Sequence, residues 1–176
     1  VYVEFSSEKV LVMDYMDGVS AGHADDVIQK LGLDRKVLAR TLLHSFLKQA
    51  LVSGIFHADP HPGNVYIDRK QGFMTMLDFG AVGRLAAPQQ EGLKLFLLGI
   101  DHTDARLVYD GVTLLVENAS EVDSGEVELA ISQTLLKVSY VDHIPTDELI
   151  YSVFSIVRDF GLRFYPSVSV ALRAII

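Results

Sequence analysis

The sequence predicts an α+β fold that is mostly α-helical and contains one short β-hairpin. Two observations support the helical part: apolar residues recur at helical spacing along 34–52 and again through most of the chain after residue 88. A third observation predicts the hairpin, because two short apolar segments, 65–67 and 73–77, flank the polar connection 68–72. The 176 residues suffice for one domain with a sizeable hydrophobic core.

In the first third of the chain, the sequence predicts two strands and two helices. Residues 1–5 alternate weakly between apolar and polar, and residues 10–15 form a stronger strand candidate that ends at Asp17-Gly18. A short helix with a loop is expected over 20–33. Asp34 then caps a longer helix that runs to about residue 52 and ends at Gly54. The side chains expected in its buried stripe are Leu43, Phe46, Leu47, Ala50 and Leu51.

In the C-terminal half of the chain, the sequence predicts helices and no strands. They are expected over 89–100, from a cap at Thr103 to about residue 116, from a cap at Ser124, from Thr146 to Gly161, and from Pro166 onward. The residues expected to face inward are Leu93, Phe96, Leu97 and Ile100, then Val127, Ile131, Leu135 and Val138, then Ile150, Val153, Phe154 and Val157. Four acidic residues are expected to be solvated or capping: Asp101, Asp104, Asp123 and Asp142.

Composition excludes several classes of function. The chain has no cysteine, so it forms no disulfide, no thiol nucleophile and no cysteine zinc site. The net charge of −8 argues against broad nucleic-acid binding and gives no general attraction to anionic lipid. The densest apolar patch, residues 95–100, is far too short to span a membrane.

The segment between residues 54 and 85 carries the residue types that phosphoryl transfer from a nucleotide requires. Asp59 lies five residues before Asn64, and Asp78 opens a DFG triplet fourteen residues after Asn64. At this spacing in a protein kinase, the first aspartate accepts the proton of the attacking hydroxyl. The asparagine and the DFG aspartate bind magnesium.

The loop and the hairpin give this spacing a physical reason. Pro60, Pro62 and Gly63 favour a tight loop that turns the first carboxylate toward the nucleophile and the asparagine toward the metal. The hairpin then returns Asp78 to a place beside Asn64, so that two oxygen ligands converge. The sequence therefore predicts Mg²⁺ held by Asn64 and Asp78, with phosphate oxygens and waters completing its coordination.

The strings HADPHPGN and LDFGAVGRL resemble the UbiB/AarF family of atypical kinase-like proteins, also called ADCK-type kinases. The resemblance extends more loosely from about Val10 to the last residue. It implies a protein-kinase-like C-lobe whose hairpin carries the catalytic and DFG loops. It also implies binding of ATP and Mg²⁺, ATPase or kinase activity, and a link to ubiquinone or other isoprenoid-lipid metabolism.

The resemblance also sets the expected partners. Nucleotide is the first partner, followed by lipid or quinone-precursor molecules and lipid-biosynthetic proteins. Nucleic acid is not expected. Peripheral membrane association is expected only through regions outside this chain, and the sequence does not specify a compartment.

The string VLVMDYMDG resembles the strand and hinge that join the two lobes of a kinase. On that resemblance Met13 is the gatekeeper, and the backbone of Asp14 and Met16 hydrogen-bonds the adenine edge. An ordinary edge strand followed by a turn is the alternative.

The histidines and Ala58 distinguish this loop from that of most protein kinases. His57 stands where HRD-type kinases carry a histidine that packs against the catalytic loop and does no chemistry. Ala58 replaces the arginine that binds a phosphorylated activation loop, which predicts no such switch. His61 replaces the lysine that stabilises the transferred phosphate, so Asp59 and His61 are the expected catalytic residues. Similar loops, HGDLHPGN, occur in aminoglycoside and choline phosphotransferases.

A zinc site made by His57 and His61 is the weaker alternative. Ligands four residues apart need a helix to share one face, and the two prolines of the loop oppose a helix. Beyond the loop, Phe79 is expected in the core, with Gly80 and Gly83 permitting backbone turns. The second DFG triplet, residues 159–161, falls at a helix end without a catalytic loop before it and is not expected to act.

The N-lobe of a kinase-like enzyme supplies a strand lysine, its glutamate partner and a loop over the nucleotide. Neither these nor the family's KxGQ signature precede Val10. The chain is therefore expected to be a piece truncated at both ends, with 1–19 as the end of the N-lobe and the hinge, and 20–176 as the helical C-lobe. Such a piece is expected to be inactive alone. Two alternatives stay open: a small-molecule phosphotransferase of the aminoglycoside or choline kinase type, and a non-catalytic nucleotide-binding regulator.

Overall fold

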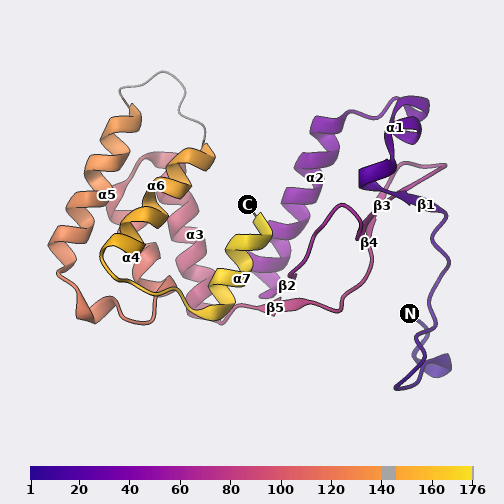
Figure 1. The fold of residues 1–176 in the computed structure, drawn as a ribbon, viewed down its shortest axis with the longest axis horizontal. Helices are drawn as coiled ribbons and strands as arrows, with labels where there is room; N and C mark the ends of the chain where they lie inside the picture. Colours follow the sequence, from indigo (N-terminus) through magenta and orange to yellow (C-terminus); the bar gives the residue numbers. More distant parts are fainter. Residues whose placement is uncertain (140–145, 176) are drawn as a thin grey trace. The chain divides into compact units, whose positions relative to one another are not determined.

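The computed structural model describes residues 1–139 and 146–175 (Figure 1). The chain forms two compact units, each built from two stretches of sequence. Val1–Leu42 and Pro60–Phe79 make the first unit, and Leu43–Asp59 and Gly80–Ile176 make the second. The structure is mixed α/β and mostly helical, with two small antiparallel sheets, which agrees with the predicted α+β class. No helix in the described part of the chain is both long and apolar enough to cross a membrane.

A three-stranded antiparallel sheet organises the first unit. Its order is β1 (Gly18–Ser20), β3 (Val65–Asp68), β4 (Met74–Met76). Val65 pairs with Met76, and Ile67 pairs with Met74. The hairpin predicted from the two apolar segments and their polar connection is therefore confirmed.

The core of the first unit lies against one face of this sheet. A 3₁₀ turn, η2 (Ala21–His23), leads into helix α1 (Asp25–Leu31), which confirms a short helix within 20–33. Ala24, Val27 and Ile28 pack with Ile67 of β3. Burial of these apolar side chains stabilises the small sheet, since a hairpin alone is only marginally stable in water.

The strands predicted before β1 are wrong. Residues 3–5 form a single 3₁₀ turn, η1 (Val3–Phe5), and no strand covers residues 11–17. The segment makes few ladder contacts: the Tyr2 N–H donates to the Val12 carbonyl at 2.8 Å, and Ser7 and Val10 form one isolated bridge. A strand needs a neighbour to pair with, and most apolar side chains here stay exposed, Tyr15 at 91%.

Helix α2 (Arg35–Lys48) begins in the first unit and ends in the second. Its cap is the one predicted, because the Lys36 N–H donates to the Asp34 carboxylate at 2.7 Å. The helix continues as a π-helical turn, η3 (Gln49–Ser53), and ends at Gly54, whose φ of 67° is left-handed. A side chain at Gly54 would also collide with the Leu85 carbonyl, so glycine is required twice over.

The predicted buried stripe of this helix holds with one exception. Phe46 and Ala50 are buried, and Leu47 and Leu51 pack against the same core. Leu43 is 47% exposed, so its predicted burial is wrong. It lies one turn before Phe46, where the core of the second unit begins.

The second unit is a set of helices with one two-stranded antiparallel sheet. The sheet pairs β2 (Ile55–His57) with β5 (Val82–Arg84). The helices are α3 (Ala87–His102), α4 (Ala105–Leu115), α5 (Ser124–Ser139), α6 (Thr146–Asp159) and α7 (Pro166–Ile175), with a 3₁₀ turn η4 (Ala119–Glu121). The helices expected after residue 88 are thus all present.

The core of the second unit is aromatic at its centre. Phe96 of α3 stacks on Phe154 of α6 with ring centroids 5.7 Å apart, and Phe164 meets Phe154 edge-on at 5.4 Å. The inward faces predicted for α3, α5 and α6 are buried or half-buried at every described position. Asp142 lies outside the described residues, as does the side chain of Val138.

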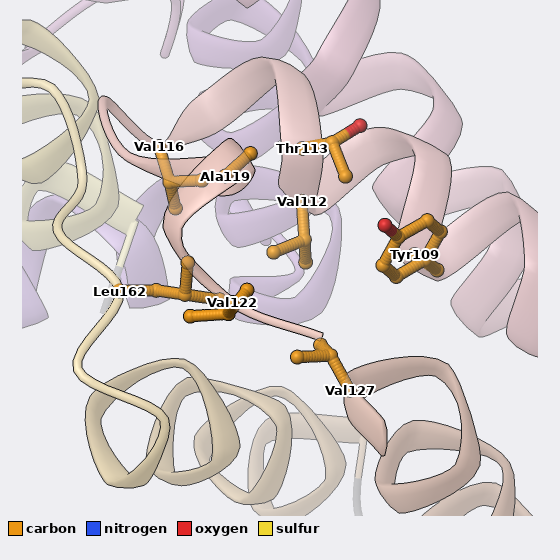
Figure 2. A pocket seen from close by; sticks show the side chains of 8 residues that line it. All are labelled: Tyr109, Val112, Thr113, Val116, Ala119, Val122, Val127 and Leu162. Carbon is orange, nitrogen blue, oxygen red and sulfur yellow. The ribbon is translucent and has the colours of Figure 1, made fainter. Parts of the chain in front are cut away.

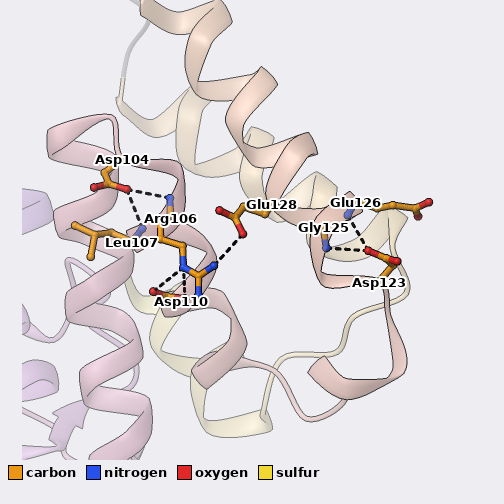
Figure 3. A network of polar contacts seen from close by, with 8 residues as sticks. All are labelled: Asp104, Arg106, Leu107, Asp110, Asp123, Gly125, Glu126 and Glu128. Carbon is orange, nitrogen blue, oxygen red and sulfur yellow. Dashed lines mark hydrogen bonds and ion pairs between the residues drawn. The ribbon is translucent and has the colours of Figure 1, made fainter.

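Two helix caps differ by one residue from those predicted (Figure 3). Asp104, not Thr103, caps α4 by accepting the N–H groups of Arg106 and Leu107 at 2.9 and 3.1 Å. Thr103 instead ends α3 in a left-handed conformation with φ 55°. In the same way, Asp123 precedes Ser124 and caps α5, accepting the N–H groups of two residues at 2.8 and 3.2 Å. The predicted capping role of both aspartates is confirmed.

One cation links α4 to α5. The Arg106 guanidinium lies 3.1 Å from the Asp110 carboxylate and 3.1 Å from that of Glu128 (Figure 3). These carboxylates raise the pKa of the Arg106 side chain above its usual value, with Asp110 the larger cause. Beneath this pair of helices a small apolar gap of about 10 Å³ is lined by Val112, Val127 and Leu162, among others (Figure 2). Its size and wholly apolar wall indicate imperfect packing, not a ligand site.

Candidate functional site

The β3–β4 hairpin brings the backbone of Asn64 next to the start of the DFG triplet. The Leu77 N–H donates to the Asn64 carbonyl at 2.8 Å, directly beyond the Val65–Met76 pair. Asp78 follows Leu77, so Asn64 and Asp78 leave the same end of the hairpin. Both residues belong to the first unit. The Asp78 carboxylate and the Asn64 amide supply oxygen ligands of the kind that Mg²⁺ prefers, so the chemistry of this pair fits a magnesium ion.

The turn of the hairpin is fixed by Asp68. Its carboxylate accepts the backbone N–H groups of Lys70 and Gln71 at 2.8 and 2.5 Å. These two bonds lower the pKa of the Asp68 carboxyl below its usual value, and the bond from Gln71 is the larger cause. Desolvation raises the pKa, but by less. Because the turn sets the register of β3 and β4, Asp68 also fixes which residues meet at the far end of the hairpin.

We expect the stability contributed by Asp68 to depend on pH. A carboxyl whose pKa is lower in the folded state stabilises the fold above its unfolded pKa of about 4 and loses that contribution as pH falls through the folded pKa. Asp68→Asn keeps an acceptor oxygen but cannot titrate. The measurement is the free energy of unfolding in urea, followed by circular dichroism. The parent should be more stable than Asp68→Asn above about pH 5, and this difference in stability should shrink as the pH is lowered. A difference that stays constant from neutral to acid pH would contradict this.

Asp78 adopts a backbone conformation that the sequence did not reveal. Its φ is 59°, in the left-handed region, where a non-glycine residue is uncommon and aspartate is among the better tolerated. Such residues cost about 1–3 kcal/mol and cluster at functional sites. The left-handed turn at the DFG triplet is thus made by the aspartate, whereas Gly80 and Gly83 were expected to allow it.

The neighbouring Phe79 is 59% exposed, so the expectation that it lies in the core is wrong. Leu77, the residue directly before the triplet, is half-buried. Gly83 has a packing role instead: it pairs with Phe56, and a Cβ there would overlap the Phe56 ring. Phe56 is 1% exposed and meets Phe46 edge-on at 5.5 Å, so this ring cannot move aside easily.

Asp59 lies in the second unit, two residues after β2. Its backbone N–H donates to Nδ1 of His57 at 3.2 Å, and the His57 ring is 1% exposed. The predicted packing and hydrogen-bonding role of His57 is therefore confirmed. The Asp59 residue is itself exposed.

The loop after Asp59 is a tight turn, as predicted. The Asn64 N–H donates to the His61 carbonyl at 2.8 Å, and the Gly63 N–H donates to His61 Nδ1 at 3.0 Å. His61 is exposed. Among the described residues, no group of three or more His, Cys, Asp or Glu side chains is placed to hold a metal ion.

The three residues predicted to form the hinge lie in the extended segment before β1. Met13 is 47% exposed. The Asp14 carboxylate accepts the Tyr2 hydroxyl at 2.6 Å, and this bond raises the pKa of Tyr2. The sulfur of Met16 lies 3.5 Å from the Thr75 hydroxyl of β4, which ties the end of this segment to the hairpin. The nucleotide contacts assigned to the three residues stay predictions.

One cavity of the first unit was missed by the sequence analysis. It measures about 180 Å³ and lies between α2 and β3. Leu38 and Leu42 of α2 and Val65 of β3, the residue after Asn64, are among its mostly apolar lining. No sequence pattern could have located it, because its walls come from segments more than twenty residues apart.

Comparison with known proteins identifies the family. The model of the ABC1 atypical kinase-like domain matches residues 1–111. A Synechocystis protein, "Uncharacterized protein slr0889", is 31% identical over 170 residues, which cover 90% of this chain and 40% of the relative. A second Synechocystis protein, "Uncharacterized protein sll1770", is 28% identical over 99% of this chain and 30% of the relative.

A plant relative carries an informative name. "Protein ACTIVITY OF BC1 COMPLEX KINASE 8, chloroplastic" of Arabidopsis thaliana is 37% identical over 105 residues, which cover 59% of this chain and 14% of the relative. The chain thus spans less than half the length of each of these three relatives. The family match covers both the HADPHPGN loop and the DFG triplet, and the chain belongs to the ABC1 family of atypical kinase-like proteins, the UbiB/AarF family that the motifs indicated.

Proposed function

We propose that the complete protein is an atypical kinase or ATPase of the UbiB/AarF type that requires ATP and Mg²⁺. In this proposal the described chain is the hinge and C-lobe of the kinase-like fold. The observation that supports it most is the hydrogen bond between Leu77 and Asn64 at the end of the β3–β4 hairpin, which brings the backbone of the two proposed metal ligands together. The family match supports the same assignment.

Each proposed site residue has one task. Asn64 and Asp78 hold Mg²⁺, which when bound neutralises charge on the nucleotide phosphates. The Asp59 carboxylate accepts the proton of the attacking hydroxyl or water, and His57 orients the Asp59 backbone. His61 donates a hydrogen bond to the transferred phosphoryl group. Met13, Asp14 and Met16 contact the adenine.

A physiological role is proposed by resemblance alone. The family link points to ubiquinone or other isoprenoid-lipid metabolism, with lipid or quinone-precursor molecules and lipid-biosynthetic proteins as partners. The word "kinase" in the plant relative's name agrees with phosphoryl transfer. The acceptor of the phosphoryl group is not specified by any residue of this chain.

The test is the metal dependence of nucleotide binding. We expect the complete protein to bind ATP by calorimetry only when Mg²⁺ is present, and Asp78→Asn to weaken that binding about tenfold or more, since a hard cation loses one charged ligand. Asparagine tolerates the left-handed backbone at this position, so the fold should be kept.

The chain supplies a matched control in its second DFG triplet. Asp159 ends α6 and lies exposed, 3.6 Å from Arg158. Asp159→Asn also removes one negative charge from the first position of a DFG triplet, and it should leave nucleotide affinity unchanged. Equal affinity of the parent and Asp78→Asn would remove Asp78 from the metal site, and metal-independent binding would reject the proposed function.

A further inference from the structure

In the β2–β5 ladder the backbone N–H of His57 points away from the neighbouring strand. In this antiparallel pair the Ala58 N–H donates to the Ala81 carbonyl at 3.0 Å. Since successive N–H groups along a strand point to opposite sides, the His57 N–H points away from β5. Among the residues that the structure describes, this sheet consists of β2 and β5, and the acceptor of the His57 N–H is not a strand. A buried backbone donor needs an acceptor from elsewhere.

A side chain of the π-helical turn provides that acceptor. Oε1 of Gln49 accepts the His57 N–H at 3.0 Å. Nε2 of Gln49 donates to the Ser45 hydroxyl one turn earlier on α2, at 3.3 Å, which fixes the orientation of the amide. Gln49 is the first residue of the turn η3, and π-helical turns often mark functional sites.

The two bonds form a continuous path toward Asp59. Gln49 holds the backbone of His57, and the ring of His57 holds the backbone of Asp59 through the 3.2 Å bond to Nδ1. All three residues belong to the second unit. We propose that Gln49 is a positioning residue for the proposed catalytic base: it sets the position of Asp59 through His57 and does not itself touch substrate. This inference rests on the function proposed above.

The consequence is specific to catalysis because of where the path ends. Asp59 is exposed and begins the loop that follows β2. A displacement of about 1 Å in a reacting group can cost about a hundredfold in rate without changing ground-state binding. Asn64 and Asp78, the proposed metal ligands, belong to the first unit.

The test compares Gln49→Met, which removes the acceptor at similar volume, with Gln49→Glu, which keeps Oε1. In the complete protein we expect Gln49→Met to lower kcat about a hundredfold with the affinity for Mg-ATP unchanged. Hydrogen exchange followed by NMR should show lost protection at the amides of His57 and Asp59. Gln49→Glu should retain both kcat and protection.

Gln90→Met is the matched control. The Gln90 side chain also bonds a backbone group, since its Nε2 donates to the Leu85 carbonyl at 3.1 Å, but Leu85 follows β5 and not β2. Gln90→Met should leave the exchange of the His57 and Asp59 amides unchanged. If Gln49→Met does not fold, Gln49→Asn replaces it, because its amide is one methylene too short to reach.

The exchange readout separates this proposal from the proposed function. Unchanged protection and kcat in Gln49→Met, or a Gln49→Glu as impaired as Gln49→Met, would overturn the positioning role. A parent protein without turnover would reject the proposed function, while lost amide protection in Gln49→Met would still support the path from Gln49 to Asp59. Loss of protection together with equal loss of Mg-ATP affinity would indicate a general structural role and overturn the proposal.

Discussion

Replacing Asp59 by asparagine is expected to lower kcat of the complete protein by about 10²- to 10⁴-fold, the contribution that general acid–base catalysis usually makes. Asparagine has nearly the same shape and keeps the backbone N–H that donates to His57, but it cannot take up a proton. Nucleotide affinity should change little, since the proposed metal ligands are Asn64 and Asp78. The measurement is steady-state ATP turnover at saturating Mg-ATP, with binding measured separately.

A second exposed aspartate serves as the control for this prediction. Asp101 lies near the end of α3 and contacts only His102, at 3.6 Å, among the ion pairs of the described residues. Asp101→Asn should turn over at the parental rate. A parental rate in Asp59→Asn would exclude Asp59 as the base. Nucleotide binding without turnover in the parent would instead favour the non-catalytic regulator.

Replacing Gly83 by alanine is expected to destabilise the second unit by about 3 kcal/mol, at the upper end of what overpacking costs. The new Cβ would overlap the Phe56 ring, and that ring is buried against Phe46. Either the ring leaves its site or the β2–β5 pair separates. The melting temperature measured by circular dichroism should fall by about 6–12 °C for a protein of this size class.

Two further variants locate the cause. Gly125 lies at the start of α5, and a Cβ there would meet only the Asp123 carboxylate at 3.2 Å, so Gly125→Ala should be close to neutral. Combining Gly83→Ala with Phe56→Leu should recover part of the lost stability, because the smaller side chain makes room. A melting temperature of Gly83→Ala equal to that of the parent would show that the strands accommodate the methyl group.

Local signals predicted the elements whose stabilising contacts lie close in sequence. The hairpin followed from two apolar segments and a polar turn, and the long helix followed from its Asp34 cap and the glycine at its end. The caps of α4 and α5 were misplaced by one residue, because Thr103 and Ser124 are also of residue types that cap helices. The choice depended on where the preceding element ended.

Features that depend on distant partners were not predictable. Residues 10–15 have strand-forming composition, but a strand requires a paired neighbour, and in the described part of the chain this segment makes only an isolated bridge and one further backbone bond. Gly83 was assigned to backbone turning, and only its position opposite Phe56 shows that it accommodates a ring. At the site, motif spacing indicated Asp59, Asn64 and Asp78, whereas the role of Gln49 depends on which way the His57 N–H points.

The left-handed backbone of Asp78 limits how this position can diverge during evolution. Selection on the fold alone tolerates glycine, asparagine and aspartate there and disfavours most other side chains. Asparagine is one nucleotide change from aspartate in the genetic code, and it also keeps the turn. A descendant that lost the charge of its proposed metal ligand by that change would therefore retain the turn, so metal affinity at this position can fall without a loss of the fold.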